Sequence, residues 1–402
     1  MGQHHRYGVE SCDLLLFAKP MLAGTAKKGW NLMLLVVGQD RGIQERLSVE
    51  LAEVESHFAA ELLSDLPCVN DLVTHVERYR GKMLRPMLVL VSGLATGPAA
   101  QMLRSNGNGH GHGHGHGNGS SHAFDALRPD ALNHAHRIIA TVVEMVHMAT
   151  LVHDDILDEA EVRRQGTTVN ALNGNEAAVM LGDYMISHAY HLCSSIDQPA
   201  ISRMIADATN TVCEGELLQL ANRNNWLLDE GTYFEIIRRK TASLTGGCCK
   251  LGAVLHDEAD ATIGQLLYQY GEKVGTAFQV VDDLLDLVGE EKTVGKSLGR
   301  DLVKGKLTLP LIHYLSTAPA SQKQPMLAMI QSISSELTAT TATARTIAQV
   351  RSAITSSDAI DYARQTAQRL IDEAKTALEV LPESPARTLL GDMADAVLTR
   401  KS

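Results

Sequence analysis

Apolar residues recur every three or four positions along most of the chain from about residue 44 onward. Leu47, Leu51, Val54, Phe58 and Leu62, for example, fall on one face of a helix. The same period runs through segments 130–158, 169–195, 199–223, 231–252, 259–288, 306–317, 357–380 and 385–400. No segment shows the alternation of apolar and polar residues between hairpin turns that is typical of β-sheets. The pattern therefore predicts an all-α protein that folds as a single large helical bundle.

Two segments do not follow this period. Residues 1–43 contain no steady apolar repeat beyond the last few positions and are expected to form a poorly ordered leader, followed by one domain over 44–402. Within that domain, residues 106–122 read NGNGHGHGHGHGNGSSH. Alternating Gly and His cannot build a core, so a flexible insertion is predicted at 104–123. Its histidines could bind Zn or Ni adventitiously, but glycine spacing does not fix the geometry of metal ligands.

Composition narrows the functional class. The chain has 402 residues, of which 45% are apolar and only 4% aromatic, which favours helices over β-structure. The formal net charge of −11, without a long basic run, argues against a nucleic-acid partner. The six cysteines form no CxxC pair and no apolar run is long enough to span a membrane, so a reduced, cytoplasmic setting is predicted.

The most informative residues are two clusters of aspartates in apolar surroundings. Residues 151–166 read LVHDDILDEAEVRRQG, and residues 278–289 read FQVVDDLLDLVG. On a helix, Asp154 lies beside Asp158, and Asp282 lies beside Asp286. Paired carboxylates repel each other unless a cation neutralises them, and Mg²⁺ is commonly held by one or two carboxylates together with substrate phosphates. Two such clusters facing each other across a cavity are expected to hold Mg²⁺ ions that bind a diphosphate.

Chance is a poor explanation for two copies of this motif. One DDxxD is expected about 0.1 times in a chain of this size, and two only a few times in a thousand, at roughly average composition. A single copy could be a solvated helix end. The pair in apolar context indicates a site.

Basic and polar residues stand close to both acidic motifs. Each of them alone could be an exposed surface side chain, but their clustering favours a diphosphate site, because Arg offers forked donors and Lys a point charge to phosphate oxygens. Lys82 and Arg85, in RGKMLRP, are expected on one face at a helix start. The others are His147, Arg163, Arg164, Lys240, Thr241, Gln279, Lys296, Arg300, Lys304 and Lys306.

The chain resembles the all-trans polyprenyl diphosphate synthases, which have the isoprenoid synthase fold, a helical bundle around a central cavity. The matching elements are RGKMLRP, EMVHMATLVHDDILDEAEVRRQG, NEAAVMLGDYMIS, KTASL, FQVVDDLLD and GKSLGRDLVKGKLTLPLI. They occur in the family's order and cover the chain from about residue 45 to its end. The family's first motif is often GGKxxRP, and Arg80 replaces its first Gly here.

This resemblance implies a role for each matching residue and a homodimer as the default assembly. Asp154, Asp158, Asp282 and Asp286 would hold Mg²⁺, and Asp155 and Asp283 would support them from other faces of their helices. The diphosphate of isopentenyl diphosphate would be bound by Lys82, Arg85, His147 and Arg164. The allylic diphosphate would be bound by Arg163, Lys240, Thr241, Gln279, Lys296 and Lys306. The catalytic group would comprise Asp154, Asp158, Lys240 and Asp282.

Product length in this family depends on the depth of the pocket below the first aspartate motif. Ala149 and Thr150 occupy the positions where bulky aromatic residues stop growth at short products. Small residues leave the pocket open, which predicts a long all-trans product such as a quinone side-chain precursor. A very hydrophobic product is also consistent with peripheral membrane contact. The alternative is a short-chain farnesyl or geranylgeranyl diphosphate synthase in which Ala149 only allows close helix packing.

Three rival functions remain open. A terpene cyclase or head-to-head synthase would share the aspartates but does not need Lys82, Arg85 and His147. A non-catalytic subunit of a heteromeric synthase would be expected to lack some of the aspartates or phosphate-binding residues. A metal-storage protein built around the Gly/His run would leave both aspartate motifs unexplained.

Overall fold

The computed structural model describes residues 40–77, 81–97, 132–163, 166–256, 260–289, 299–335 and 341–400. Nearly all of them are helical, which confirms the predicted all-α class. The α-helices are α2 (Arg41–Glu61), α3 (Pro67–Glu77), α4 (Leu84–Thr96), α7 (His134–Leu157), α8 (Val169–Ser194), α9 (Pro199–Ala221), α10 (Glu230–Ile237), α11 (Ser243–Val254), α12 (Ala261–Val288), α14 (Arg300–Val303), α15 (Leu309–Thr317), α16 (Ala320–Ser335), α17 (Thr341–Thr355), α18 (Ala359–Ala377) and α19 (Pro385–Leu398). A π-helical turn η3 (Arg238–Ala242), a 3₁₀ turn η4 (Leu378–Val380) and a ribbon of β1 (Val162–Arg163) with β2 (Gly166–Thr167) complete the set.

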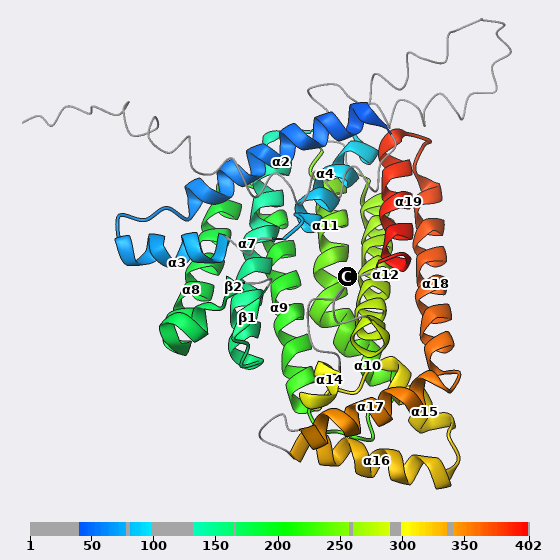
Figure 1. The fold of residues 1–402 in the computed structure, drawn as a ribbon. Coiled ribbons are helices and arrows are strands. Elements are labelled where there is room, and N and C mark those ends of the chain that lie inside the picture. The colour runs from blue at the N-terminus through cyan, green and yellow to red at the C-terminus, as the bar shows by residue number, and fades with distance from the viewer. Residues whose placement is uncertain are drawn as a thin grey trace, which may run out of the picture.

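Helices α8, α7, α9, α11 and α12 follow one another across the molecule, with α8 toward the left of the view (Figure 1). Helix α2 crosses one end of this bundle, and α10 and α14 to α17 gather at the other end (Figure 1). Helix α12 is central, since it packs against α11, α18, α19 and η3. Its buried positions include Leu267, Tyr270, Ala277 and Val280, all of them fully enclosed. The core therefore surrounds the helix that carries the second aspartate motif.

The first described helix begins slightly earlier than the predicted start of the domain at residue 44. Helix α2 begins at Arg41, because the Asp40 side chain accepts a hydrogen bond from the Ile43 amide at 3.1 Å and so caps it. The rest of the predicted leader, residues 1–39, and the Gly/His segment 104–123 lie outside the described residues. Helices α16 and α17 were not predicted, because they bury few apolar side chains and α17 is rich in Thr.

A buried ion pair joins α2 to α7. Glu50 is only 1% exposed, and the Arg137 guanidinium donates to both of its oxygens at 2.6 and 3.0 Å. Arg46 adds a third contact at 2.7 Å from within α2. Because each charge in this group is partnered, its burial is tolerated, and α2 is held at a fixed position across α7.

Helix α7 also meets the length and composition of a membrane-spanning helix. Within the part of the chain that the structure describes, it is the one helix that does so, and 72% of its apolar window is buried inside the protein. It begins at the capping residue Asn133 and ends in the first aspartate motif. Its apolar composition is accounted for by its place in the core.

The start of α7 is held by a buried histidine. His136 Nε2 lies 3.0 Å from the Gly252 carbonyl oxygen, and Nδ1 lies 2.7 Å from Asn133 Oδ1 and 3.3 Å from the Asn133 backbone nitrogen. The His256 ring lies 4.7 Å away, centroid to centroid. Burial, followed by the charge that His256 can carry, lowers the pKa of His136 to about 3.

Acidification is therefore expected to destabilise the fold through His136. The unfolded chain takes up a proton at this residue near its ordinary pKa of 6.5, whereas the folded chain does not until about pH 3. The contribution of His136 to the free energy of unfolding is fully present above pH 6.5. It should fall by about 1.4 kcal/mol per pH unit as the pH drops from 6.5 to 5. Urea unfolding across this range should show the slope in the wild type and in His191→Gln, whose parent side chain is 80% exposed. His136→Gln should lack it, and an unchanged slope in that variant would contradict the assignment.

Candidate active site

The first aspartate motif lies at the C-terminal end of α7. Asp154 occupies the last turn, and Asp158 is the C-cap, whose amide donates to the Asp154 carbonyl at 2.8 Å. The helix stops there because Glu159 adopts a left-handed conformation with φ 47°. The C-terminus of a helix carries partial negative charge, so two carboxylates at this position create a strongly negative end that attracts cations.

Three lysines from distant parts of the chain contact these carboxylates. The Lys240 Nζ lies 3.6 Å from Asp154 Oδ1. Asp158 is contacted by Lys304 at 2.7 Å and by Lys306 at 3.2 Å. The structure therefore brings the predicted residues Lys240 and Lys306 to the predicted aspartates, across 86 and 148 positions of sequence.

The two carboxyls differ in their electrostatic balance. Burial, reinforced by Glu216 and Asp158, raises the pKa of Asp154 despite the nearby Lys240. Burial also raises the pKa of Asp158, but Lys306 and Lys304 outweigh it and hold the pKa of that carboxyl at about 2. The charge at Asp154 is thus under-compensated by the protein's own cations, which is a condition that a divalent cation relieves.

The second aspartate motif lies near the end of α12. Asp286 accepts hydrogen bonds from the backbone amides of Arg300 and Asp301, both at 3.2 Å, at the start of α14. Asp282 is 51% exposed and has the Arg400 guanidinium 3.5 Å away. That guanidinium in turn lies 3.9 Å above the ring of Phe278, so the C-terminal end of the described chain contacts the motif.

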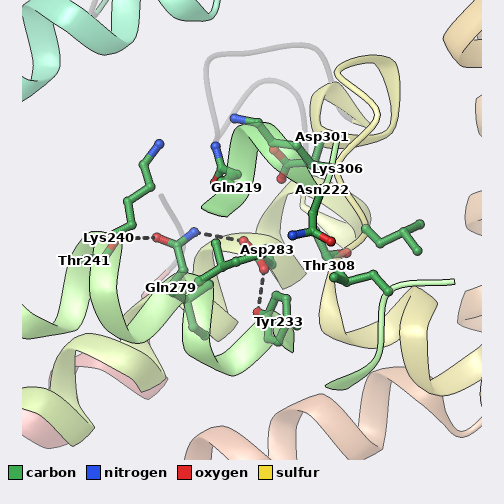
Figure 2. A pocket seen from close by; sticks show the side chains of 14 residues that line it. Gln219, Asn222, Tyr233, Lys240, Thr241, Gln279, Asp283, Asp301, Lys306 and Thr308 are labelled. Atoms are coloured by element: carbon green, nitrogen blue, oxygen red, sulfur yellow. Dashed lines mark hydrogen bonds between the residues drawn. The ribbon is translucent and has the colours of Figure 1, made fainter. Parts of the chain in front are cut away.

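A polar cavity of about 130 Å³ lies beside the second motif, which contributes Asp283 to its lining. Figure 2 shows Lys240 and Thr241 at one side, Gln279 and Asp283 in the middle, and Lys306 at the other side. The remaining lining residues are Gln219, Asn222, Leu228, Tyr233, Ile236, Ile237, Asp301, Leu307 and Thr308. Lys240 and Lys306 line this cavity and also contact Asp154 and Asp158, so the two lysines connect the cavity to the first motif.

The middle of the cavity is a chain of hydrogen bonds. Gln279 Nε2 donates to Asp283 Oδ1 at 2.9 Å, because residues four apart on a helix are direct neighbours. Thr241 Oγ1 donates to Gln279 Oε1 at 3.3 Å, and the Tyr233 hydroxyl donates to Asp283 Oδ2 at 2.6 Å. Burial, followed by the charge of Asp301, raises the pKa of Asp283 well above its usual range.

Lys240 and Thr241 belong to the π-helical turn η3. Such a turn has one more residue than an α-helical turn, and it changes the direction in which the following side chains point. Close packing against α9 is permitted by Gly215, where a Cβ atom would lie 2.4 Å from the Lys240 backbone nitrogen. The neighbouring Glu216 forms an ion pair with Lys240. The lysine is therefore held between Glu216 and Asp154.

The loop that carries Lys304 and Lys306 is fixed by a glycine between them. Gly305 has φ +68°, and a Cβ at this position would lie 2.0 Å from Asn224 Oδ1. Its carbonyl accepts a hydrogen bond from the Asn224 amide at 2.9 Å. Only glycine fits this contact, and it allows both lysines to reach Asp158.

The residues expected to bind the second diphosphate are only partly placed. The prediction that Lys82 and Arg85 share a helical face is wrong: Met83 has φ 54°, α4 begins at Leu84, and Lys82 precedes the helix. Arg85 lies in the first turn of α4, and His147 is half-buried on α7, two turns before Asp154. Arg164 and Lys296 lie outside the described residues.

Two further predicted features have defined surroundings. The Arg163 guanidinium contacts the buried Asp155 at 2.8 Å, which agrees with a supporting place for Asp155 beside the motif. Ala149 is fully buried, and Thr150 donates from Oγ1 to the His147 carbonyl at 2.7 Å. Both residues lie on α7 just before Asp154, as the sequence requires.

Lys304, which was expected near the aspartates in the same Gly-rich run as Lys306, is the cation nearest to Asp158. Three other residues of the site were not singled out from the sequence, although each has a local signal. Glu216 follows Gly215, and Arg223, which lies 3.7 Å from Asp158, follows the end of α9. Asp301 lines the cavity, where burial and then Asp286 raise its pKa to about 6.

The oxygen atoms of the two motifs are of the kind that a divalent metal ion needs. Among the described residues, no three His, Cys, Asp or Glu side chains converge closely enough to form a ready-made metal site. The carboxylates of the two motifs, on α7 and α12, are hard oxygen donors, and burial with neighbouring acids raises the pKa of Asp154 despite Lys240. This arrangement fits Mg²⁺, which keeps waters and completes its coordination with substrate phosphates.

Comparison with known proteins identifies the family. The model of the polyprenyl synthetase family matches residues 67–347. The chain belongs to the polyprenyl synthetase family. It is 31% identical over 360 residues to octaprenyl diphosphate synthase of Escherichia coli (strain K12), covering 89% of this chain and 98% of that protein. It is 29% identical over 355 residues to heptaprenyl diphosphate synthase component 2 of Bacillus subtilis (strain 168), covering 88% of this chain and 89% of that protein.

A polyprenyl synthetase of known structure has the same fold. The polyprenyl synthase from Caulobacter crescentus CB15, complexed with calcium and isoprenyl diphosphate, is 27% identical and covers 91% of this chain and 99% of its own, with a TM-score of 0.75. The isoprenoid synthase architecture inferred from the motifs is therefore confirmed at the level of fold. That structure also contains a divalent cation, which agrees with the oxygen-rich donor set of this polyprenyl synthetase.

Proposed function

We propose that this polyprenyl synthetase condenses isopentenyl diphosphate with an allylic diphosphate and repeats the step to make a long all-trans polyprenyl diphosphate. The observation that carries the proposal is that Lys240 and Lys306 contact Asp154 and Asp158 of the first motif and also line a polar cavity with Asp283 of the second motif. An anionic substrate in this cavity would form ion pairs with the lysine side chains directly. Its link to the carboxylates would be a metal ion bound by both.

The metal ligands in this proposal are Asp154, Asp158, Asp282 and Asp286. When bound, Mg²⁺ would supply charge stabilisation to the oxygens of the leaving diphosphate. The allylic diphosphate is assigned to Arg163, Lys240, Thr241, Gln279, Lys296 and Lys306, and the isopentenyl diphosphate to Lys82, Arg85, His147 and Arg164.

The chain's own residues then account for the chemistry. Lys240 and Lys306 hold the diphosphate as the allylic C–O bond breaks, and their charge favours the departing anion over the ester. The isopentenyl double bond forms the new C–C bond with the allylic carbon, and a proton is lost to the departing diphosphate. The cavity is lined by apolar residues such as Leu228, Ile236 and Ile237 beside the polar ones, which limits attack by water.

A long product is supported by the small residues before the first motif. Ala149 has no side chain beyond Cβ to close a pocket below Asp154, and Thr150 turns its hydroxyl to the backbone. The relatives named above make octaprenyl and heptaprenyl diphosphates by name. We place this enzyme with them, as a cytoplasmic source of quinone side chains whose product favours peripheral membrane contact.

A homodimer is part of the proposal. Helix α8 exposes the large apolar side chains of Leu172, Val179 and Met180 at 55, 41 and 64%. The non-helical Gly174 separates Leu172 from the other two, and exposed large apolar side chains on one helix support a protein partner. The word "component" in the name of the Bacillus subtilis relative favours a second candidate, in which this chain is one subunit of a heteromeric synthase.

The test is a product assay with purified protein. The protein is incubated with Mg²⁺, labelled isopentenyl diphosphate and either farnesyl or geranylgeranyl diphosphate, and the products are sized by chromatography. A ladder that ends well beyond twenty carbons supports both the chemistry and the open pocket. Products that stop at fifteen or twenty carbons keep the reaction but reject the long chain. No incorporation by a folded protein would favour the heteromeric alternative.

A further inference from the structure

Tyr233 lies behind the predicted diphosphate-binding residues. It is on α10, its side chain is 3% exposed, and its hydroxyl donates to Asp283 Oδ2 at 2.6 Å. Figure 2 shows the ring below Asp283, on the side away from Lys240. A buried tyrosine hydroxyl needs a partner, and here the partner is the Asp283 carboxylate, which lines the cavity.

The Asp283 carboxylate also accepts a hydrogen bond from Gln279. Asp283 Oδ1 accepts from Gln279 Nε2 at 2.9 Å, so the amide nitrogen faces the carboxylate and Oε1 faces the opposite way. Gln279 Oε1 accepts from the Thr241 hydroxyl at 3.3 Å. Three hydrogen bonds thus join α10, α12 and η3 in one line (Figure 2).

This line decides which way the Gln279 amide points. A primary amide can present either its oxygen or its nitrogen to Thr241, and a carboxylate that accepts from Nε2 selects the oxygen. The Tyr233 hydroxyl holds the far oxygen of that carboxylate, which otherwise stands close to the negative charges of Asp301 and Asp282. Without the hydroxyl, Asp283 loses the one contact that counters this repulsion from the side of α10.

We propose that Tyr233 is a positioning residue for the allylic diphosphate, acting through Asp283 and Gln279 on Thr241. Tyr233 does not touch the substrate in this assignment. It fixes the orientation of the residues that do. The inference rests on the proposed function, which places Thr241 and Gln279 at the allylic diphosphate.

The test compares two tyrosines that are equally buried. Tyr233→Phe removes only the hydroxyl, and it should raise KM for the allylic diphosphate about tenfold, as expected for one hydrogen bond to a charged group. KM for isopentenyl diphosphate and kcat should stay within about twofold. The control is Tyr270→Phe: Tyr270 is fully buried on α12, and its hydroxyl donates to the Leu390 carbonyl at 2.7 Å, outside the cavity. Both variants should lose a similar amount of thermal stability, and only Tyr233→Phe should change KM.

A double-mutant cycle with Thr241→Val separates the inference from the function on which it rests. If Tyr233 acts through Thr241, the double variant should be hardly worse in allylic KM than Thr241→Val alone. Two outcomes would overturn the inference and leave the proposed function standing. In the first, the effects of the two substitutions on the allylic KM are fully additive. In the second, Thr241→Val raises the allylic KM but Tyr233→Phe does not change it. An unchanged allylic KM in Thr241→Val overturns the assignment of Thr241, and the inference with it.

Discussion

Replacing Asp154 by Asn is expected to lower turnover by about a thousandfold or more while the protein stays folded. The substitution keeps the shape of the side chain but removes the charge that offsets Lys240 and that is proposed to hold metal. Because Lys240 retains Glu216 as an ion-pair partner, no buried cation is left alone and the fold should persist. The measurement is incorporation of labelled isopentenyl diphosphate, with circular dichroism and thermal unfolding as checks on the fold.

A surface aspartate supplies the matched control. Asp361 lies on α18, its side chain is 72% exposed, and it pairs only weakly with Arg364 at 3.6 Å. Asp361→Asn should keep full activity. Activity retained in Asp154→Asn would reject the metal assignment of the first motif, because no other carboxylate occupies that position on α7.

The second large effect concerns product length. Ala149→Phe is expected to shorten the product from a long polyprenyl chain to about fifteen or twenty carbons, since an aromatic ring at this position would block the pocket that is proposed below Asp154. The first condensations should proceed at close to the wild-type rate, because the diphosphate-binding residues are unchanged. Products are sized by chromatography after the same incubation with farnesyl diphosphate.

The volume of the side chain is the variable in this experiment. Ala149→Ser changes the volume little, and it should leave the product distribution as in the wild type. Because Ala149 is fully buried, overpacking could disturb the helix, so thermal unfolding of both variants must be compared. A folded Ala149→Phe enzyme that still makes the full-length ladder would show that the pocket ends elsewhere.

Much of the fold could be predicted from the sequence. A long amphipathic segment buries one face of its helix and a long apolar segment buries all of them, and this does not depend on which helices surround it. Helices α7 and α12 are examples, with bounds within a few residues of those expected. Helices α16 and α17 could not, because they are short of apolar residues and depend on packing against neighbouring helices. The π-helical turn η3 leaves no mark on the apolar period, so the direction of Lys240 was only visible in the structure.

The aspartates of the site could also be predicted from the sequence, but the contacts that their side chains make could not. The spacing of Asp154 and Asp158 on one helix face follows from local geometry alone. The contacts of Asp158 with Lys304 and Lys306 depend on how a loop 146 and 148 residues away folds back, and on Gly305 in that loop. The left-handed Met83, which separates Lys82 from α4, is a local backbone feature that no residue preference indicates.

The lysines at Asp158 have one more consequence. Lys304 and Lys306 act as internal counter-ions of a carboxylate that is also assigned to a metal, so a cation arriving there must release them. A released lysine is available to an anion, and an anion that takes up the lysine frees the carboxylate. The metal therefore displaces the carboxylate that competes with diphosphate for the lysines, and the diphosphate displaces the lysines that compete with metal for the carboxylate. Bound metal must raise the affinity for diphosphate by the same factor as bound diphosphate raises the affinity for metal.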